Sequence, residues 1–532
     1  MSRLATVLVV AAMALAADVV HGAATIVASV LVGHQAPVLC ADSVKAKMFV
    51  PNYADGTLSV IDTATLLVTA TVPVGANPRR LVCNEATHRV YVVNATTPGT
   101  LTVVDATTNA VVATVAVGAD PRTVGANFLV DEVYVANFGS GTLSVVDTKT
   151  NAVVATIPVG TGPGAPTSND RLHRTYVPSA TDGTVTVIDQ PARAVAATVK
   201  VGNGPQYAAV DGRHGKVYVN NVTDRTMSVI DGATNAVVTT LPTGAGTSFD
   251  FPSVNGAYRR AYLPNATDNT LTVIDTDTDT IVATIPVGAS PVDALADATT
   301  GDLYVVNQGG NSVTIVDAAT DAVIGTLAVG GGPTRVFELG ERLYVLNANG
   351  SNRDSVTVAT KQGTIVGTAI ATELYHAGFD HYFHTADETE ARLLRDGLFD
   401  DDWHRTFEFW RVWSAPGPGR SAVCRFFSAS YAPKSSHFYT PYAAECASLQ
   451  AGGVWQLEST AVFYLMLPDA TGACPAGTAP LYRTYNDGKG DAPNHRYTAS
   501  RALRDQMVLQ GWTAEGSGPD TVFACTPTLK GG

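Results

Sequence analysis

Short apolar runs rich in β-branched residues alternate with polar turns along much of the chain. The clearest example lies between Gly141 and Gly160, where one apolar run ends at Asp147 and a second begins at Ala152. Val, Ile and Thr suit the pleated surface of a sheet, and the Thr, Lys and Asn between the two runs favour a turn. The stretch therefore predicts one β-hairpin.

The Asp that ends the first strand of this hairpin recurs at a nearly constant interval. Its seven positions are Asp62, Asp105, Asp147, Asp189, Asp231, Asp275 and Asp317. Subtraction gives steps of 43, 42, 42, 42, 44 and 42 residues. Each period also holds a Gly-x-x-Pro segment that leads into an apolar run, and a further apolar run that ends in Asn. Four short antiparallel strands in about 40 residues are typical of one β-propeller blade.

Prolines predict the order of the strands within a blade. The last strand of several periods contains one: Pro73, Pro158, Pro242 and Pro286. Because proline cannot donate a hydrogen bond to a neighbouring strand, it is largely confined to edge strands. We therefore expect this strand at the outer edge of each blade, and the strand after each Gly-x-x-Pro segment along the central channel.

Three of the apolar runs that end in Asn are nearly identical: Tyr91–Asn94, Tyr134–Asn137 and Tyr304–Asn307. With the S/T-V-x-V/I-D and A-V-V-A-T-x-x-V-G segments that follow them, they resemble the YVTN-type β-propeller repeat proteins. The resemblance covers residues 25–370 and implies an all-β propeller. Some copies depart from the pattern: Ser179 stands where the others have Asn, Phe49 replaces Tyr, and Ala359 stands where an eighth Asp would be.

The number of blades depends on which segment closes the ring. Eight runs of the YVxN kind occur, and the last unit has an outer-strand candidate of its own near Thr364 to Ala369, which favours eight four-stranded blades. The segment from Thr25 to Gly33 reads as another outer strand. Either segment could close the ring, and seven blades with a spare unit is the alternative.

The N-terminus has the pattern of a secretory signal peptide, which we assign to residues 1–24. Arg3 precedes an apolar run from Leu4 to Ala17, and small residues follow it. This run is too short for a membrane span, although an uncleaved anchor is the alternative. The net charge of −13 argues against nucleic acid as a partner. We expect a secreted, periplasmic or surface-held protein with no transmembrane segment after cleavage.

The composition changes after Ala371. All five tryptophans and four of the six cysteines lie beyond it. Three short strand signals recur there: Phe383–Thr385, Phe438–Thr440 and Arg496–Thr498. They resemble a secreted domain family of unknown function with S-H-F-Y-T repeats, which brings no established activity. We expect a small α+β domain of three pseudo-repeats over residues 372–529.

Cysteine placement predicts three structural disulfides, because an oxidising compartment is expected and no zinc spacing occurs. The pairs are Cys40–Cys83, Cys424–Cys446 and Cys474–Cys525. Three histidines, His376, His381 and His384, invite a metal interpretation. Related strands carry one His per copy, which favours a structural network, and we expect neither a metal nor another cofactor.

Two groups of residues are candidates for binding. The residues just after Gly-x-x-Pro segments should lie at one mouth of the channel, where they could hold a small anion or a peptide. They include Arg79, Arg80, Arg122, Gln206, Tyr207, Asp293 and Arg335. A solvated rim is the alternative. In the second domain, Trp403, Trp410 and Trp413 could stack on sugar rings, with core packing as the alternative.

The pattern favours an exported, non-catalytic binding or scaffold protein. The propeller would present its loops, and the second domain would recognise a glycan, a cell-wall component or a protein. One alternative is a lactonase-like hydrolase with its site at the channel mouth. Another is a structural protein of the surface-layer type.

Overall fold

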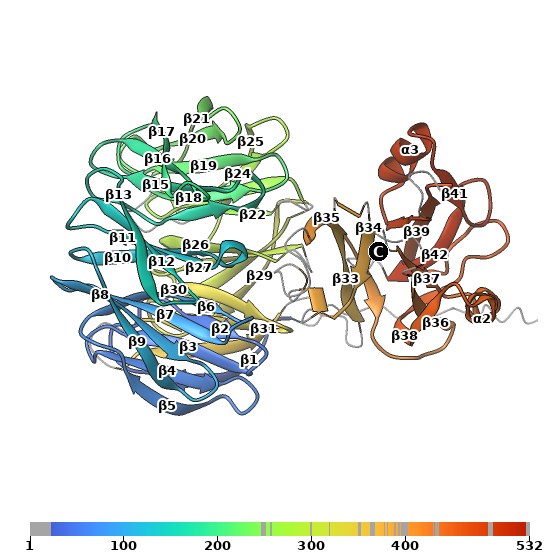
Figure 1. Ribbon diagram of the computed structural model, residues 1–532, viewed down its shortest axis with the longest axis horizontal. Helices are drawn as coiled ribbons and strands as arrows, with labels where there is room; N and C mark the ends of the chain where they lie inside the picture. Colours follow the sequence, from blue (N-terminus) through green and yellow to red (C-terminus); the bar gives the residue numbers. More distant parts are fainter. Residues whose placement is uncertain are drawn as a thin grey trace, which may run out of the picture.

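The computed structural model describes residues 23–527, apart from 246–251, 256–257, 298–300, 319, 349–352, 362–367, 377, 380, 388–389, 392–393, 395–402, 429, 431–435 and 488–492. Nearly all of the signal peptide assigned to residues 1–24 lies outside the described residues. Figure 1 shows two bodies, a propeller and a smaller C-terminal domain beside it.

Eight four-stranded antiparallel sheets form the propeller, which confirms the predicted number of blades. Blade 1 consists of β2 (Cys40–Asp42), β3 (Lys47–Asn52), β4 (Thr57–Asp62) and β5 (Leu67–Pro73), and blade 2 of β6 (Pro78–Asn84), β7 (Arg89–Asn94), β8 (Gly99–Asp105) and β9 (Ala110–Val117). Blade 3 consists of β10 (Pro121–Asn127), β11 (Glu132–Asn137), β12 (Thr142–Asp147) and β13 (Ala152–Pro158), and blade 4 of β14 (Thr167–Asn169), β15 (Arg174–Ser179), β16 (Thr184–Asp189) and β17 (Ala194–Lys200). Short 3-10 helices, η1 (Phe128–Val130) and η2 (Asp170–Leu172), follow β10 and β14.

Blades 5 to 8 complete the ring. Blade 5 consists of β18 (Pro205–Asp211), β19 (Lys216–Asn221), β20 (Thr226–Asp231) and β21 (Ala236–Pro242), and blade 6 of β22 (Ser253–Asn255), β23 (Arg260–Asn265), β24 (Thr270–Asp275) and β25 (Thr280–Pro286). Blade 7 consists of β26 (Pro291–Ala296), β27 (Asp302–Asn307), β28 (Ser312–Asp317) and β29 (Ala322–Ala328). Blade 8 consists of β30 (Pro333–Leu339), β31 (Arg342–Asn347), β32 (Ser355–Thr360) and the N-terminal strand β1 (Ile26–Leu31).

Strand order within a blade follows the prolines. The strand that begins after Gly-x-x-Pro contacts the corresponding strand of the next blade and lies innermost, whereas the proline-containing strand is the exposed outer edge. The two strands between them are buried, and their side chains pack between neighbouring blades. Phe49 and Val60 of blade 1, for example, pack with Leu81 and Val92 of blade 2.

The N-terminal strand closes the ring. β1 pairs antiparallel with β32, from Ile26 opposite Ala359 to Leu31 opposite Ser355, and thus supplies the outer strand of blade 8. The expectation of an outer strand near Thr364 to Ala369 is wrong, because residues 368 and 369 open a strand of the C-terminal domain. The other residues of that segment, 364–367, lie outside the described residues.

The two repeated polar residues have distinct structural roles. The Asp that ends the third strand accepts hydrogen bonds from backbone N–H groups in the next turn, as Asp62 does from Ala64 and Thr65. The Asn that ends the second strand donates to hydroxyl groups of the third strand, as Asn137 does to Thr142 and Ser144, and the Asn94 amide also donates to the Val74 carbonyl of blade 1. Both residues satisfy buried or turn polar groups, so they recur with each blade.

The C-terminal domain consists mostly of strands, with two described helices. Its elements are β33 (Thr368–His376), β34 (His381–Thr385), β35 (Trp403–Trp413), β36 (Arg420–Ser428), β37 (Ser436–Thr440), α2 (Ala443–Gly452), β38 (Gln456–Met466), β39 (Thr478–Tyr485), β40 (His495–Thr498), α3 (Arg501–Leu509), β41 (Thr513–Glu515) and β42 (Val522–Pro527). All ten strands join one sheet. No helix among the described residues is both long and apolar enough to cross a membrane.

The domain packs on the face of the propeller at which the innermost strands end (Figure 1). Arg411 of β35 is only 5% exposed and lies in the field of Asp297 and Glu341, which belong to propeller loops on that face. Burial lowers the pKa of Arg411, and these carboxylates partly offset the shift. The opposite face of the propeller remains open.

Three disulfides join the same pairs that the sequence predicts. Cys40–Cys83 links the innermost strands of blades 1 and 2. Cys424–Cys446 ties β36 to α2, and Cys474–Cys525 ties the loop before β39 to β42.

Candidate binding site at the mouth of the propeller channel

A cavity of about 650 Å3 opens at the face where the innermost strands begin. Its walls come from the first residues of these strands and from the turns between the second and third strands of the blades. Volumes of roughly 300–1,000 Å3 are usual for sites that hold small organic molecules. The cavity therefore has room for a ligand much larger than a water molecule.

A β-bulge directs two consecutive residues of each contributing strand toward this cavity. The register of β6 against β7 shifts between Pro78 and Arg80, so Arg79 is an extra residue on the inner strand. The same shift occurs after Pro121 and after Pro333. Because two residues of a bulged strand oppose one residue of its partner, neighbouring side chains can face the same side.

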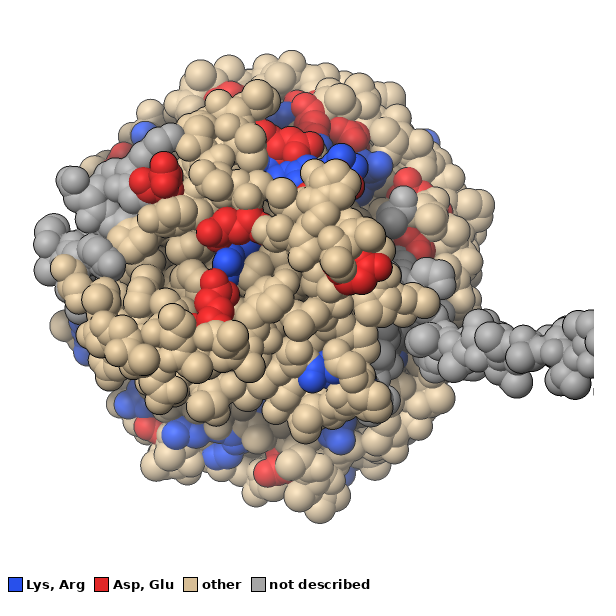
Figure 2. Space-filling model, turned by 90° about the vertical axis from the view of Figure 1, so that its right-hand side faces the viewer, with Lys and Arg blue, Asp and Glu red and all other residues tan. Residues whose placement is uncertain are grey.

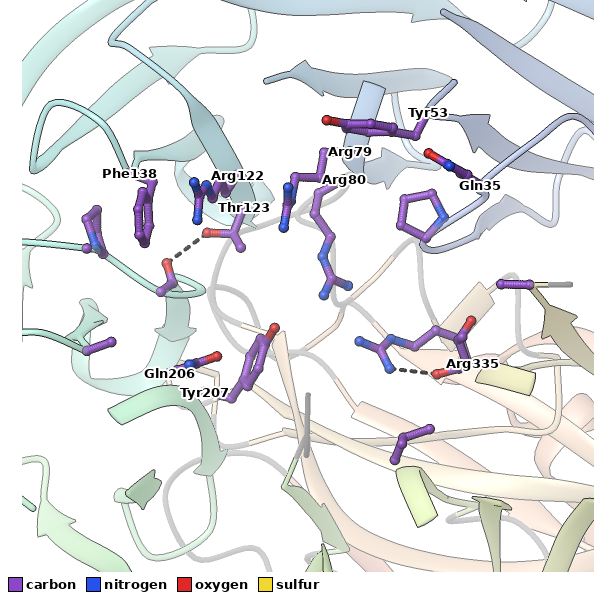
Figure 3. A pocket seen from close by; sticks show the side chains of 18 of the residues that line it. Gln35, Tyr53, Arg79, Arg80, Arg122, Thr123, Phe138, Gln206, Tyr207 and Arg335 are labelled. Carbon is purple, nitrogen blue, oxygen red and sulfur yellow. Dashed lines mark hydrogen bonds between the residues drawn. The ribbon is translucent and has the colours of Figure 1, made fainter. Parts of the chain in front are cut away.

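Four arginines line the cavity as a result. Arg79 and Arg80 come from β6 of blade 2, Arg122 from β10 of blade 3 and Arg335 from β30 of blade 8. Figure 3 shows the guanidinium groups of Arg80 and Arg335 pointing toward the centre of the cavity from different sides. Among the described residues that line it, none is Asp, Glu or His. The structure thus brings together the four arginines that the sequence placed at the channel mouth.

Arg122 is held in place by two contacts. Its Nε donates to Asp120 at 2.8 Å, and its guanidinium carbon lies 3.5 Å from the ring centroid of Phe138. A planar guanidinium that stacks on an aromatic ring and is paired on one edge keeps its remaining donors in a defined direction. Arg122 is therefore preorganised, although Asp120 neutralises part of its charge.

Arg335 lies deeper and has a buried carboxylate beside it. Burial lowers the pKa of Arg335 to about 10, and Asp293 opposes that shift, so the guanidinium stays charged at neutral pH. It donates to the Thr334 carbonyl at 2.6 Å. Burial raises the pKa of Asp293, while Arg335 and the Val336 N–H, 3.0 Å away, favour its charged form.

Arg79 has no ion pair and no side-chain hydrogen bond among the described residues. Burial lowers its pKa first, and the positive charges of Arg122 and Arg80 lower it further. Arg79 therefore brings to the cavity a positive charge that no ion pair among the described residues neutralises. Such a charge inside a partly desolvated cavity attracts anions strongly.

The tryptophan candidates lie elsewhere, inside the C-terminal domain. Trp410 is 2% exposed, Trp413 7% and Trp403 8%. Trp410 packs in the main apolar cluster of the domain, and Trp403 packs against His381 and Phe383. Their ring faces are covered by protein, so the expectation that they stack on sugar rings does not hold for this structure. Core packing, the alternative, describes them.

The histidines of the second domain form hydrogen-bond and ring contacts with one another and with acids. His437 Nδ1 and His381 Nε2 lie 2.8 Å apart, and His437 Nε2 lies 3.2 Å from Glu458. His384 Nε2 lies 3.1 Å from the buried carboxylate of Glu373. No group of three metal-ligating side chains occurs among the residues that the structure describes.

Charged residues are intermixed on the side of the molecule seen in Figure 2. Lys and Arg lie next to Asp and Glu, and no broad basic area is visible among the coloured residues of that view. Affinity for nucleic acid depends on clusters of basic residues that neutralise phosphates.

Comparisons with known proteins concern the two bodies separately. Residues 371–519 match a family model described as a domain of unknown function, DUF5648. A search of curated proteins finds no match. Among solved structures, dihydro-heme d1 dehydrogenase NirN in complex with DHE is similar, with a TM-score of 0.52 and 17% identity over 63% of this chain and 76% of that one.

Two further structures have lower TM-scores. Hydrazine synthase of Kuenenia stuttgartiensis has a TM-score of 0.44 and 19% identity, covering 62% of this chain and 98% of that one. BamB from Moraxella catarrhalis has a TM-score of 0.46 and 17% identity, covering 64% and 100%. At such identities only the fold is shared, and the chain is a β-propeller that carries a C-terminal domain similar to the DUF5648 family.

Proposed function

We propose that this is an exported binding protein whose propeller captures an anionic ligand at the channel mouth. The observation that carries the proposal is the convergence of four arginines on one cavity of about 650 Å3. The chain as a whole has a net charge of −13, so a cationic cavity is contrary to its general composition. Guanidinium groups suit carboxylates and phosphates because they can donate two parallel hydrogen bonds.

Binding without catalysis fits the chemistry of the lining. A hydrolase at this place would use a general base or metal ligands. The described lining offers arginine, glutamine, tyrosine and threonine side chains, which bind and orient a ligand. The hydrolase proposed as an alternative from the sequence therefore receives less support than a binding protein.

Export is proposed from the pattern of residues 1–24, and the three disulfides agree with an oxidising compartment. The C-terminal domain lies on the face opposite the mouth, so it leaves the cavity accessible. This placement suits a division of roles in which the propeller binds the ligand. The C-terminal domain would attach the protein to a glycan, a cell-wall component or another protein.

Calorimetric titration of the full-length protein with citrate tests anion binding. We expect binding at about 0.01 M salt that weakens strongly at about 1 M, because screening shortens the range of the charges. Loss of a charge-assisted hydrogen bond costs about 1.5–3 kcal/mol, so Arg79→Ala should weaken binding roughly tenfold or more. Arg213→Ala is the matched control, since Arg213 is exposed on the opposite face.

Two results would overturn the proposal. One is the absence of salt-sensitive citrate binding by the wild-type protein. The other is an equal loss of affinity in the Arg79→Ala and Arg213→Ala proteins, because the binding would then reflect the whole surface.

A further inference from the structure

We infer that the ligand of the channel mouth is an organic dianion with a flat, aromatic body. The inference rests on the proposed anion binding and adds the class of ligand. It follows from three properties of the cavity, namely its volume, the entry of its arginines from different sides and the buried aromatic ring of Tyr207 in its wall.

The volume excludes a small inorganic anion as a good fit. A water molecule occupies about 30 Å3, and a tetrahedral oxyanion is only a few times larger. The cavity measures about 650 Å3, so such an ion would leave most of the space to water. Affinity in a concave site comes mainly from covering most of the ligand surface, which calls for an organic molecule.

Arg79 defines one anionic contact of the ligand. It forms no ion pair among the described residues, and the positive charges of Arg122 and Arg80 act on it. One anionic group of the ligand is therefore expected beside Arg79.

The arginines reach the cavity from blades 2, 3 and 8, so a single charged group cannot serve all of them. Arg79 and Arg122 lie on one side, and Arg335 enters from another (Figure 3). Arg80 extends between these positions toward the centre. Two anionic groups on one rigid body can engage both sides at the same time.

The remaining walls are neutral and partly aromatic. Tyr207 is buried and borders the cavity from blade 5, where Figure 3 shows it across from Arg79 and Arg122. Val292 adds an apolar side chain, whereas the ring of Phe138 is stacked on Arg122. An aromatic wall favours a ligand with a flat apolar face, because ring contacts contribute beyond simple burial. A flat body would lie against Tyr207 while its charges face the arginines.

Four probes separate these properties in a calorimetric titration of the full-length protein at low salt. Phthalate is an aromatic dianion, succinate an aliphatic dianion, benzoate an aromatic monoanion and sulfate a small inorganic dianion. We expect phthalate to bind at least about tenfold more tightly than each of the others, a ratio that corresponds to about 1.4 kcal/mol.

Two variants test whether the tighter binding of phthalate depends on Arg335 and on Tyr207. Arg335→Gln should remove most of the advantage of phthalate over benzoate, because it deletes one of the two charge contacts. Tyr207→Leu keeps an apolar side chain of moderate size and should reduce the advantage of phthalate over succinate. A thermal unfolding curve of each variant shows whether the fold is retained. If a variant is unfolded, the comparison of the four probes on the wild-type protein still decides the inference.

Each outcome has a definite meaning. If sulfate or succinate binds as tightly as phthalate, the flat body is irrelevant and the inference fails, while anion binding stands. If benzoate equals phthalate, the requirement for two charges is wrong. If none of the probes and no citrate binds, the proposed function fails as well.

Discussion

Glu373 and Arg496 form a buried ion pair although they lie 123 residues apart in the chain. Arg496 Nη2 donates to Glu373 Oε1 at 2.8 Å, and its Nε lies 3.1 Å from Oε2. Glu373 is 0% exposed and belongs to the first pseudo-repeat of the C-terminal domain, whereas Arg496 belongs to the third. The pair therefore closes the ring of three repeats.

The other two junctions between repeats use the opposite arrangement of charge. Arg425 of the second repeat contacts Glu390 of the first, and Arg483 of the third contacts Glu445 of the second. The strand pairing places Glu373 at the position that corresponds to Arg425 and Arg483. The closing junction therefore has the acid on the strand where the others have the base.

We predict that Glu373→Gln destabilises the C-terminal domain by about 3–5 kcal/mol. The substitution removes a buried charge and leaves Arg496 without its partner, which is much more costly than losing a surface pair. Urea unfolding followed by tryptophan fluorescence measures this, since all five tryptophans lie in the domain. Asp520→Asn is the control, because Asp520 pairs with Arg501 in an exposed position and should change stability by less than about 1 kcal/mol. Similar losses in both proteins would contradict the prediction.

The N-terminal strand should be required for a stable propeller. Removal of residues 1–24 should leave the fold intact, because the pairing of β1 with β32 begins at Ile26. Removal of residues 1–33 should make the protein insoluble or sensitive to proteolysis, since it deletes the buried Val30 and Val32 and exposes an unpaired strand edge. Limited proteolysis of the two truncated proteins provides the comparison. Equal resistance would mean that β1 does not close the ring.

The repeated Asn should contribute stability through its bonds between strands and blades. Asn94 Nδ2 lies 2.9 Å from the Val74 carbonyl and 2.9 Å from Thr102 Oγ1. We predict that Asn94→Ala costs about 1–3 kcal/mol, because buried acceptors lose a donor. Asn94→Ser should cost less, since Ser179 fills this position in blade 4 and donates to the Val159 carbonyl. Chemical unfolding followed by far-UV circular dichroism measures both, and an equal cost would refute the role of the donor.

The stability of the C-terminal domain should fall as the pH decreases below about 6.5. Burial, and then the nearby charge of Arg483, lowers the pKa of His495 to about 3. Burial also lowers the pKa of His381 and His437. Between the unfolded pKa of about 6.5 and the lower folded pKa, the unfolded chain binds protons that the native state does not, so the free energy of unfolding rises with pH.

Each such histidine contributes up to about 1.4 kcal/mol per pH unit in this window. Urea unfolding monitored by tryptophan fluorescence at pH values from about 7 to about 5 provides the measurement. His495→Gln should reduce the slope of the free energy of unfolding against pH by up to the contribution of one histidine, because glutamine does not titrate. An unchanged slope in this variant, or stability that is constant over the range, would show that His495 titrates normally.

The repeat pattern by itself determined most of the propeller. Four strands per period followed from β-branched runs separated by turns, and the outer position followed from Pro73 and its counterparts, since proline lacks a backbone donor. The disulfide between Cys40 and Cys83 could be expected because the two residues stand at nearly equivalent places in adjacent blades. The arginines at the mouth could be placed because their inner strands follow Gly-x-x-Pro segments.

Tertiary structure alone decided three other features. The local pattern of an outer strand does not reveal whether the start or the end of the propeller closes the ring. The structure shows that β1 closes it, by pairing with β32 across more than 300 residues of the chain. The sequence placed both Arg79 and Arg80 at the channel mouth, but a bulge depends on the pairing register, so only the structure shows how both side chains face the cavity. Tryptophan suits a core as well as a sugar-binding surface, and only the packing around Trp410 shows that its ring is buried.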